Sequence, residues 1–140
     1  MHEPAMRMWA DDAASALLGM QAVEVAPGRG RVSMVVRPDM VNGHDLCHGG
    51  LIASLADSAF ALACNSHGPV AVAAGFTIDF LQPVRLGQTL YADAREVSLR
   101  GWSGIYDVTV RADDPEDGEV IAEFRGRSRT LPDRTSGLRG

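Results

Sequence analysis

The chain has 140 residues, of which 46% are hydrophobic and 22% charged, and its formal net charge is −5. This length allows one ordinary domain rather than two full cores, and the composition is typical of a folded chain rather than a disordered one. The negative charge disfavours nucleic acid as a partner, and no apolar run reaches the roughly 18 residues that span a bilayer, so we expect no membrane association.

The first twenty residues carry acidic side chains within an apolar pattern and have no basic start. We therefore expect no secretory signal peptide. Cys47 and Cys64 are the only cysteines, which gives no indication of a disulfide framework. Together these features predict a reducing, cytoplasmic location.

The spacing of apolar residues predicts a short amphipathic helix over residues 6–19, ended by Gly19. Two alternating segments then flank a Pro-Gly-Arg-Gly turn, which predicts a hairpin that ends at Pro38. Residues 39–50 have no period and are rich in turn-forming residues, so we expect a loop there.

The longest predicted helix begins at Gly49 and runs to about Ser66. Between Leu51 and Cys64 the only polar residues are Ser54, Asp57 and Ser58. A helix that is apolar on nearly every side is typical of a protein core.

The remaining pattern predicts four strands, over residues 70–83, 87–99, 101–112 and 119–130. In the last strand Val120, Ala122 and Phe124 alternate with mostly charged residues, so one face should contact the core and the other should face water. Residues 132–140 have almost nothing to bury and are expected to form a disordered tail, which leaves residues 1–131 as a single domain.

This order of elements predicts an α+β protein in which an antiparallel sheet curls around one central helix. A single chain of this size would leave a sheet edge and part of the helix uncovered, which favours a dimer.

Asp57 is a lone carboxylate within this apolar helix. Its neighbours on the same helical face are Ala53, Ser54, Phe60 and Ala61. None of them offers an opposite charge, and burial of an unpaired ion costs several kcal/mol. Either Asp57 pairs with a structural partner elsewhere or it works in a cleft, and the histidine and glycines upstream favour the second interpretation.

Gly49 and Gly50 open the helix. The first amides of a helix have no internal acceptor and lie at the positive end of its dipole. Glycine lets a ligand oxygen approach these amides closely, as the oxyanion of an acyl-transfer reaction requires. A tight turn into the helix would explain the same glycines.

Other chemistries are possible in the loop before the helix. His44, Asp45, Cys47 and His48 are metal-ligand types, but zinc sites usually combine ligand pairs from two segments and no second pair follows. Cys47 and His48 could form a nucleophile pair, although adjacent residues seldom face each other. Asn42 could hold a water or a carboxylate, or simply form the turn.

Arg125, Arg127 and Arg129 alternate along the last predicted strand, with successive side chains about 6–7 Å apart. Such a row could bind phosphates through bidentate contacts. A solvated sheet face that also carries Glu119 and Glu123 is at least as good an interpretation.

The segments "NGHDLCHGGLIASLADSAFALACNS" and "GFTIDFLQPVRLGQTLYADA" closely resemble the hot-dog-fold thioesterases of the phenylacetic acid degradation (PaaI) type. The resemblance extends from about residue 15 to 130. It implies an antiparallel sheet around a central helix, homodimers with a continuous sheet that associate into homotetramers, and active sites between chains. It also implies hydrolysis of an acyl-CoA, typically aryl- or hydroxyaryl-acetyl-CoA, without metal or other cofactor.

The resemblance also implies roles for individual residues. Asp57 would be the base or nucleophile, supplied by the chain that faces the oxyanion site. The Gly49 amide would be the oxyanion donor, His48 would orient the thioester carbonyl, and Asn42 would lie near the attacked carbon or water. The expected substrate contacts are Gly50, Thr77, Phe60, Arg125 and Arg127.

The sequence departs from the family pattern in two places. Asp45 stands where relatives often have a small residue. Several relatives use a Ser or Thr from the strand after the helix, where this chain has Ala73-Ala74-Gly75 and Thr77 is the nearest hydroxyl. The expected lining of the acyl pocket is Met40, Ile52, Phe60 and Phe80. Alternative functions are a non-catalytic acyl-CoA-binding module and a hot-dog hydratase or dehydratase.

Overall fold

The computed structural model describes residues 3–132. Its helices are α1 (Glu3–Ala10), α2 (Ala13–Leu17) and α3 (Gly49–Cys64), with a 3-10 turn η1 at Pro38–Met40. Its strands are β1 (Gln21–Ala26), β2 (Arg29–Val35), β3 (Ala71–Phe80), β4 (Thr89–Arg100), β5 (Ser103–Ala112) and β6 (Glu119–Thr130). The tail expected over residues 132–140 lies, apart from Pro132, outside the described residues.

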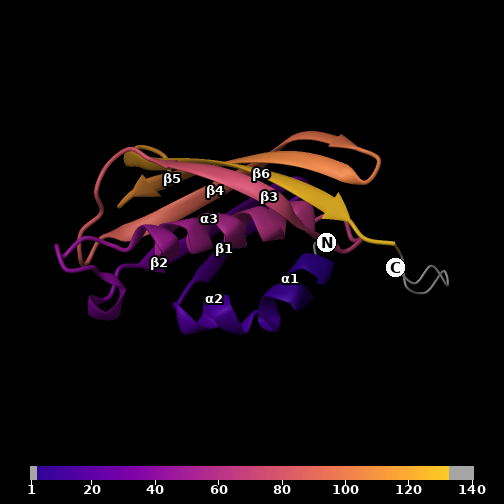
Figure 1. Cartoon of the computed structure of the whole chain (residues 1–140). Coiled ribbons are helices and arrows are strands. Elements are labelled where there is room, and N and C mark those ends of the chain that lie inside the picture. Colours follow the sequence, from indigo (N-terminus) through magenta and orange to yellow (C-terminus); the bar gives the residue numbers. More distant parts are fainter. Residues whose placement is uncertain (1–2, 133–140) are drawn as a thin grey trace.

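The six strands form one sheet in the order β1-β2-β4-β5-β6-β3, and every neighbouring pair is antiparallel. The sheet curves over α3, while α1 and α2 lie on the opposite side of that helix (Figure 1). The predicted α+β hot-dog fold is therefore confirmed. No helix within the described part of the chain is long and apolar enough to cross a bilayer.

The prediction of one helix over residues 6–19 was wrong, because two helices occupy this segment. The Asp12 side chain accepts a hydrogen bond from the Ser15 amide at 2.9 Å and so caps the start of α2. An aspartate in this capping position has extended backbone angles and interrupts a continuous helix.

The side of α3 that faces the sheet forms the centre of the core. Its buried residues include Ile52, Leu55, Ala56, Ala59, Phe60, Leu62 and Ala63. Gly30 of β2 lies directly beneath the helix, and a Cβ there would come within 2.9 Å of the Leu62 Cβ and 3.0 Å of the Ala59 carbonyl. The absence of a side chain at Gly30 therefore lets α3 pack closely on the sheet.

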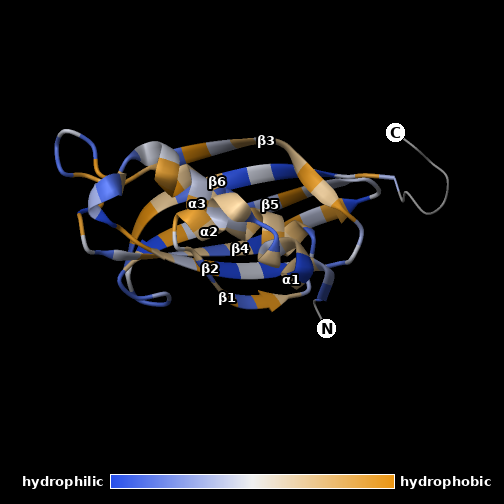
Figure 2. Ribbon diagram, turned by 90° about the horizontal axis from the view of Figure 1, so that it is seen from below, coloured by the Kyte–Doolittle hydropathy of each residue, from blue (hydrophilic) through white to orange (hydrophobic). Residues whose placement is uncertain are grey.

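Strand β3 forms one edge of the sheet, at the margin opposite β1 (Figure 2). This edge carries several exposed apolar side chains, including Val72 (43% exposed), Phe76 (41%) and Phe80 (50%). An unpaired edge with such residues is a ready template for pairing with another strand.

Candidate active site

Asp57 lies in the middle of α3 and lines a hollow of about 200 Å³ together with Asp12, Ser15, Ser54 and Ser58. Helix α2 is anchored beside it, since the Ser15 and Ser58 hydroxyl oxygens are 2.8 Å apart. Burial is the main reason that the pKa of Asp57 is raised, and the negative charge of Asp12 adds to it. No described residue donates a hydrogen bond or offers a positive charge to this carboxylate.

At the start of α3, one backbone N–H of the glycine pair has no hydrogen-bond acceptor among the described residues. His48 is the N-cap residue, and its Nδ1 accepts the Gly50 N–H at 3.3 Å. A neutral His48 ring with this acceptor carries its proton on Nε2. Among the described residues the Gly49 N–H has no acceptor, so Gly49 supplies the amide of the glycine pair that can bind a ligand oxygen.

Gly49 and Asp57 are separated along the same helix. Eight residues at 1.5 Å each place them about 12 Å apart along the axis. A carbonyl under attack needs its oxygen near the amide and its carbon near the carboxylate, both at about 3 Å. A single chain therefore cannot bring both groups to one thioester.

Asn42 organises the loop before α3. Its Oδ1 accepts the amides of His44 at 2.8 Å and Leu46 at 3.2 Å, and Asp45 adopts a positive φ of 60°. The side-chain carbonyl thus forms the turn that the sequence offered as one interpretation. Asn42 keeps its NH2 group as a donor for a ligand.

The side chains expected to contact the acyl group lie in different environments. Met40, Ile52 and Phe60 are buried in the core, and Phe60 is only 1% exposed. Phe80, by contrast, is half exposed, and its ring covers Gly49 so closely that a Cβ there would lie 3.1 Å from it. Phe80 is therefore the aromatic ring of this group that a ligand at the Gly49 amide would touch.

Thr77 and Arg125 face each other across β3 and β6. Both line a polar hollow of about 210 Å³. Asp107 binds the Arg125 guanidinium through two hydrogen bonds of 2.6 and 2.9 Å, and this pairing lowers the pKa of Asp107. Arg125 thus already has a carboxylate partner.

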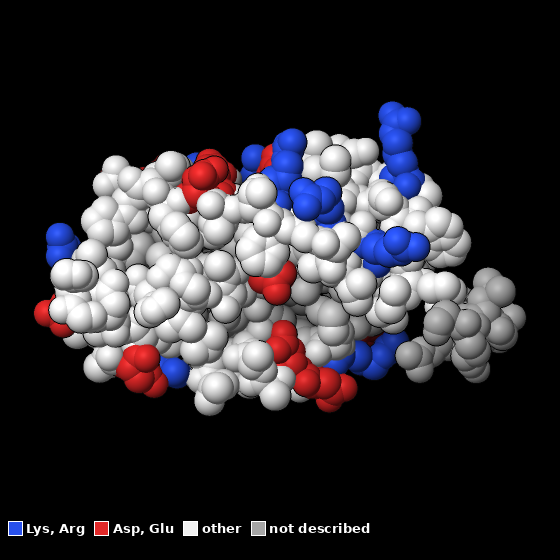
Figure 3. Space-filling model, in the orientation of Figure 1, with Lys and Arg blue, Asp and Glu red and all other residues white. Residues whose placement is uncertain are grey.

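Arg127 has a different setting from Arg125. Its guanidinium extends over Gly75, where a Cβ would lie 2.6 Å from the Arg127 Nη2. No acidic partner for Arg127 is present among the described residues. On the face shown in Figure 3, basic side chains gather toward the upper right, while acidic side chains lie near the centre and along the lower edge. The upper right of this face is therefore the part suited to an anionic group.

The two cysteines do not support a nucleophilic role. Both are free and buried. Burial raises the pKa of Cys47, and burial together with the charge of Asp57 raises the pKa of Cys64 to about 12. Neither thiol is therefore ionised at neutral pH, and a Cys47–His48 nucleophile pair is disfavoured. Residues 3–132 contain no group of three or more His, Cys, Asp or Glu that could hold a metal ion.

The structure also contains a cavity that no sequence pattern predicted. It has a volume of about 460 Å³ and lies beyond the last turn of α3. Its walls come from the end of α3, the β4–β5 hairpin and the end of β6. Because these segments are far apart in the chain, neither spacing nor a local motif could have revealed the cavity.

Comparison with known proteins relates this fold to a family. The model of the thioesterase superfamily matches residues 44–119. The acyl-coenzyme A thioesterase PaaI of Escherichia coli K12 is 41% identical over 89% of this chain and 86% of its own length. The solved structure of the E. coli PaaI protein from the phenylacetic acid degradation operon superposes with a TM-score of 0.88, covering 93% of this chain and 92% of that one at 40% identity. A Streptococcus mutans UA159 protein solved with acetyl-CoA is 26% identical, with a TM-score of 0.75 over 81% of this chain and 90% of its own.

Proposed function

The chain belongs to the thioesterase superfamily, and from that premise we propose that it is an acyl-CoA thioesterase of the PaaI type that hydrolyses an aryl- or hydroxyaryl-acetyl-CoA. In this proposal Asp57 is the base or nucleophile and the Gly49 amide is the oxyanion donor. The products are a carboxylic acid and CoA.

The observation that carries this proposal is the unpartnered carboxylate of Asp57. A half-buried carboxylate with a raised pKa and a second acid, Asp12, nearby is unfavourable for the fold. Nothing among the described residues compensates it, so a purely structural role leaves its presence unexplained. Carboxylates in such settings are common among catalytic bases and nucleophiles.

The proposed assembly is a homodimer, with two dimers associating into a homotetramer. The exposed apolar edge of β3 supports a dimer with a continuous sheet. Such a dimer would bring the Gly49 end of one α3 towards Asp57 of the other chain. The separation of about 12 Å within one chain makes this second chain a requirement of the mechanism.

In the proposed reaction, the Gly49 N–H binds the thioester carbonyl oxygen and makes its carbon more electrophilic. The Nε2–H of His48 is a second donor that orients the same carbonyl, and the Asn42 NH2 group lies close to the attacked carbon or water. Asp57 of the partner subunit then attacks the carbon to give a mixed anhydride, which water hydrolyses, or it deprotonates the attacking water. In both routes CoA leaves as a thiolate, so no strong general acid is required.

For the CoA phosphates we propose Arg127 ahead of Arg125, because Asp107 already binds Arg125. The S. mutans relative solved with acetyl-CoA supports a CoA thioester as the ligand. Thr77 and Gly50 remain proposed contacts for the rest of the substrate.

The free thiols of Cys47 and Cys64 support the proposed reducing, cytoplasmic location.

The test is release of CoA from 4-hydroxyphenylacetyl-CoA, followed with a thiol reagent. Asp57→Asn should lower kcat by at least about 1000-fold while it leaves substrate binding within a few-fold of wild type. Asp117→Asn, in an exposed loop, is the matched control and should retain full activity. Unchanged hydrolysis by Asp57→Asn would contradict the proposal.

Binding without CoA release by the wild-type protein would instead support the acyl-CoA-binding module, and hydration of an enoyl-CoA would support the hydratase.

A further inference from the structure

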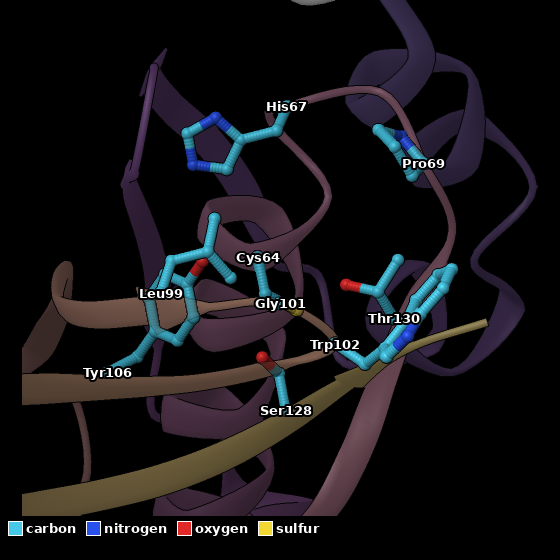
Figure 4. A pocket seen from close by; sticks show the side chains of 9 residues that line it. All are labelled: Cys64, His67, Pro69, Leu99, Gly101, Trp102, Tyr106, Ser128 and Thr130. Carbon is cyan, nitrogen blue, oxygen red and sulfur yellow. The ribbon is translucent and has the colours of Figure 1, made fainter.

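The cavity beyond the last turn of α3 has the dimensions of a small-molecule site. Its volume of about 460 Å³ falls within the usual range for ligand pockets. Figure 4 shows its walls, in which Leu99, Trp102 and the ring of Tyr106 supply apolar surface and Ser128 lies at the base. None of the residues that line the hollow around Asp57 lines this cavity.

Two of the wall residues are held in place by one carboxylate. Tyr106 donates its hydroxyl to the Glu96 Oε1 at 2.8 Å, and the His67 Nε2 lies 2.7 Å from the same oxygen. These contacts fix the Tyr106 ring and satisfy its polar end. The cavity is therefore formed before any ligand binds, which lowers the entropic cost of binding.

Ser128 is a polar residue in the cavity wall whose hydroxyl is available for a ligand. The residue is only 3% exposed, yet its hydroxyl makes no hydrogen bond to any described residue and opens into the cavity (Figure 4). Gly104 packs against it so closely that a Cβ there would lie 2.6 Å from the Ser128 Oγ. Because no buried side-chain oxygen among the described residues lacks a partner, the unpaired Ser128 hydroxyl oxygen must be reachable from the cavity, where a ligand group can donate or accept a hydrogen bond.

The cavity is aligned with Asp57 along the helix. Cys64, in the cavity wall, follows Asp57 by seven residues, which places both on one face of α3 at a separation of about 10.5 Å. Burial is the main cause of the raised pKa of Cys64, and the charge of Asp57 adds to it. By ordinary bond lengths, a para-hydroxylated arylacetyl group extends about 7 Å from its carbonyl carbon. The attack distance adds about 3 Å, so such a group is long enough to extend from Asp57 to the level of Cys64 along α3.

We propose that this cavity receives the far end of the acyl group and that Ser128 hydrogen-bonds a hydroxyl on its aromatic ring. The inference rests on the proposed thioesterase function and goes further, because it names the part of the chain that selects the acyl group. It makes Ser128 a specificity-determining residue and Trp102 an apolar wall for the ring.

The experiment compares kcat/KM for acetyl-, phenylacetyl- and 4-hydroxyphenylacetyl-CoA. Ser128→Ala should lower the ratio of 4-hydroxyphenylacetyl to phenylacetyl activity five- to tenfold, as the loss of one hydrogen bond predicts. Thr130→Phe, which fills the rim of the cavity, should lower the ratio of phenylacetyl to acetyl activity at least tenfold. Trp102→Ala should lower that ratio too, and because Trp102 is 59% exposed this variant should fold. Ser103→Ala, on the same hairpin with an exposed side chain, is the matched control.

The outcomes separate the two proposals. Hydrolysis by the wild-type protein with both ratios unchanged in the folded variants would overturn the assignment of the cavity and leave the thioesterase function intact. Equal losses on all three substrates would show a structural role for these residues and would overturn it as well. Absence of CoA release from all three substrates by the wild-type protein would remove the thioesterase proposal, and the assignment of the cavity with it.

Discussion

Gly49 occupies the first helical position of α3, where proline is well tolerated because its missing N–H has no partner within the helix. His48 has φ −63° and ψ 129°, the extended conformation that a residue before proline requires. Gly49→Pro should therefore preserve the fold while it removes the proposed oxyanion donor.

We expect Gly49→Pro to lower kcat about 100- to 1000-fold, the usual effect of losing one oxyanion donor. Gly49→Ala is the matched control, because it places a similar Cβ against Phe80 but keeps the N–H. Steady-state kinetics and circular dichroism of both variants provide the test. Equal activity of the proline and alanine variants would show that the amide has no catalytic role.

The raised pKa of Asp57 predicts how activity depends on pH. In the proposed reaction Asp57 acts as the carboxylate, so activity should be lost as the pH falls through its raised pKa. Asp12→Asn removes the second cause of that shift, and its side-chain oxygen can still cap α2. The acidic limb of the kcat/KM profile should therefore move to lower pH in this variant. A limb that stays in place or moves to higher pH would contradict the assignment of Asp57.

The proposed catalytic residues were easier to select from the sequence than the proposed binding residues. Asp57 stands out as one charge among apolar residues, and Gly49 follows a loop at the start of a long helix. Ser128 gives no such signal, because its environment depends on Gly104 and Tyr106 from another strand. Only the folded chain shows that its hydroxyl lacks a partner.

At the level of elements, α3 has two distinct faces, one that packs into the core and one that carries Asp57. Phe60 points to the sheet, with its ring centroid 5.6 Å from that of Tyr106 and 5.7 Å from that of Phe124. Asp57, three residues earlier, faces α2. A helix that is apolar nearly all round does not reveal in its sequence which face meets the sheet, so the expected substrate contact of Phe60 could not be distinguished from a core position.

Phe60→Ala should lower the free energy of unfolding by about 3–5 kcal/mol, since it leaves a cavity in the core. Phe60→Leu should keep most of the stability, and kcat/KM should remain within about threefold of wild type. Urea denaturation and the CoA-release assay measure the two effects. A stable leucine variant that loses tenfold or more in kcat/KM would show that Phe60 contacts substrate after all.

The bounds of the strands were predicted within a few residues. Apolar and polar residues alternate along a strand that has one face on the core, and this alternation stops where the strand ends. The break between α1 and α2 was missed, although Asp12 is one of the residue types favoured at a helix N-cap. The apolar residues before and after Asp12 continue one helical spacing, so the pattern favoured a single helix over two.

For the whole molecule, the fold leaves β3 at an edge beside β6, with apolar side chains facing outwards. Sequence reasoning predicted the sheet and the central helix, and its expectation of a partner chain stays a prediction. It could not predict the strand order, because the neighbouring strands β3 and β6 are distant in the chain. The strand order leaves β3 at one edge of the sheet, and in the proposed dimer that edge determines which groups the two chains share.

The central claim is that one active site combines Asp57 of one chain with the Gly49 amide of another. Co-expression of Asp57→Asn and Gly49→Pro chains with different affinity tags tests it most directly. In a twofold-symmetric dimer, random pairing makes half of the dimers mixed, and each mixed dimer has one intact site of two. The account predicts that this preparation regains about a quarter of wild-type kcat, although each variant alone is nearly inactive. Mixed dimers that are no more active than the separate variants would contradict it.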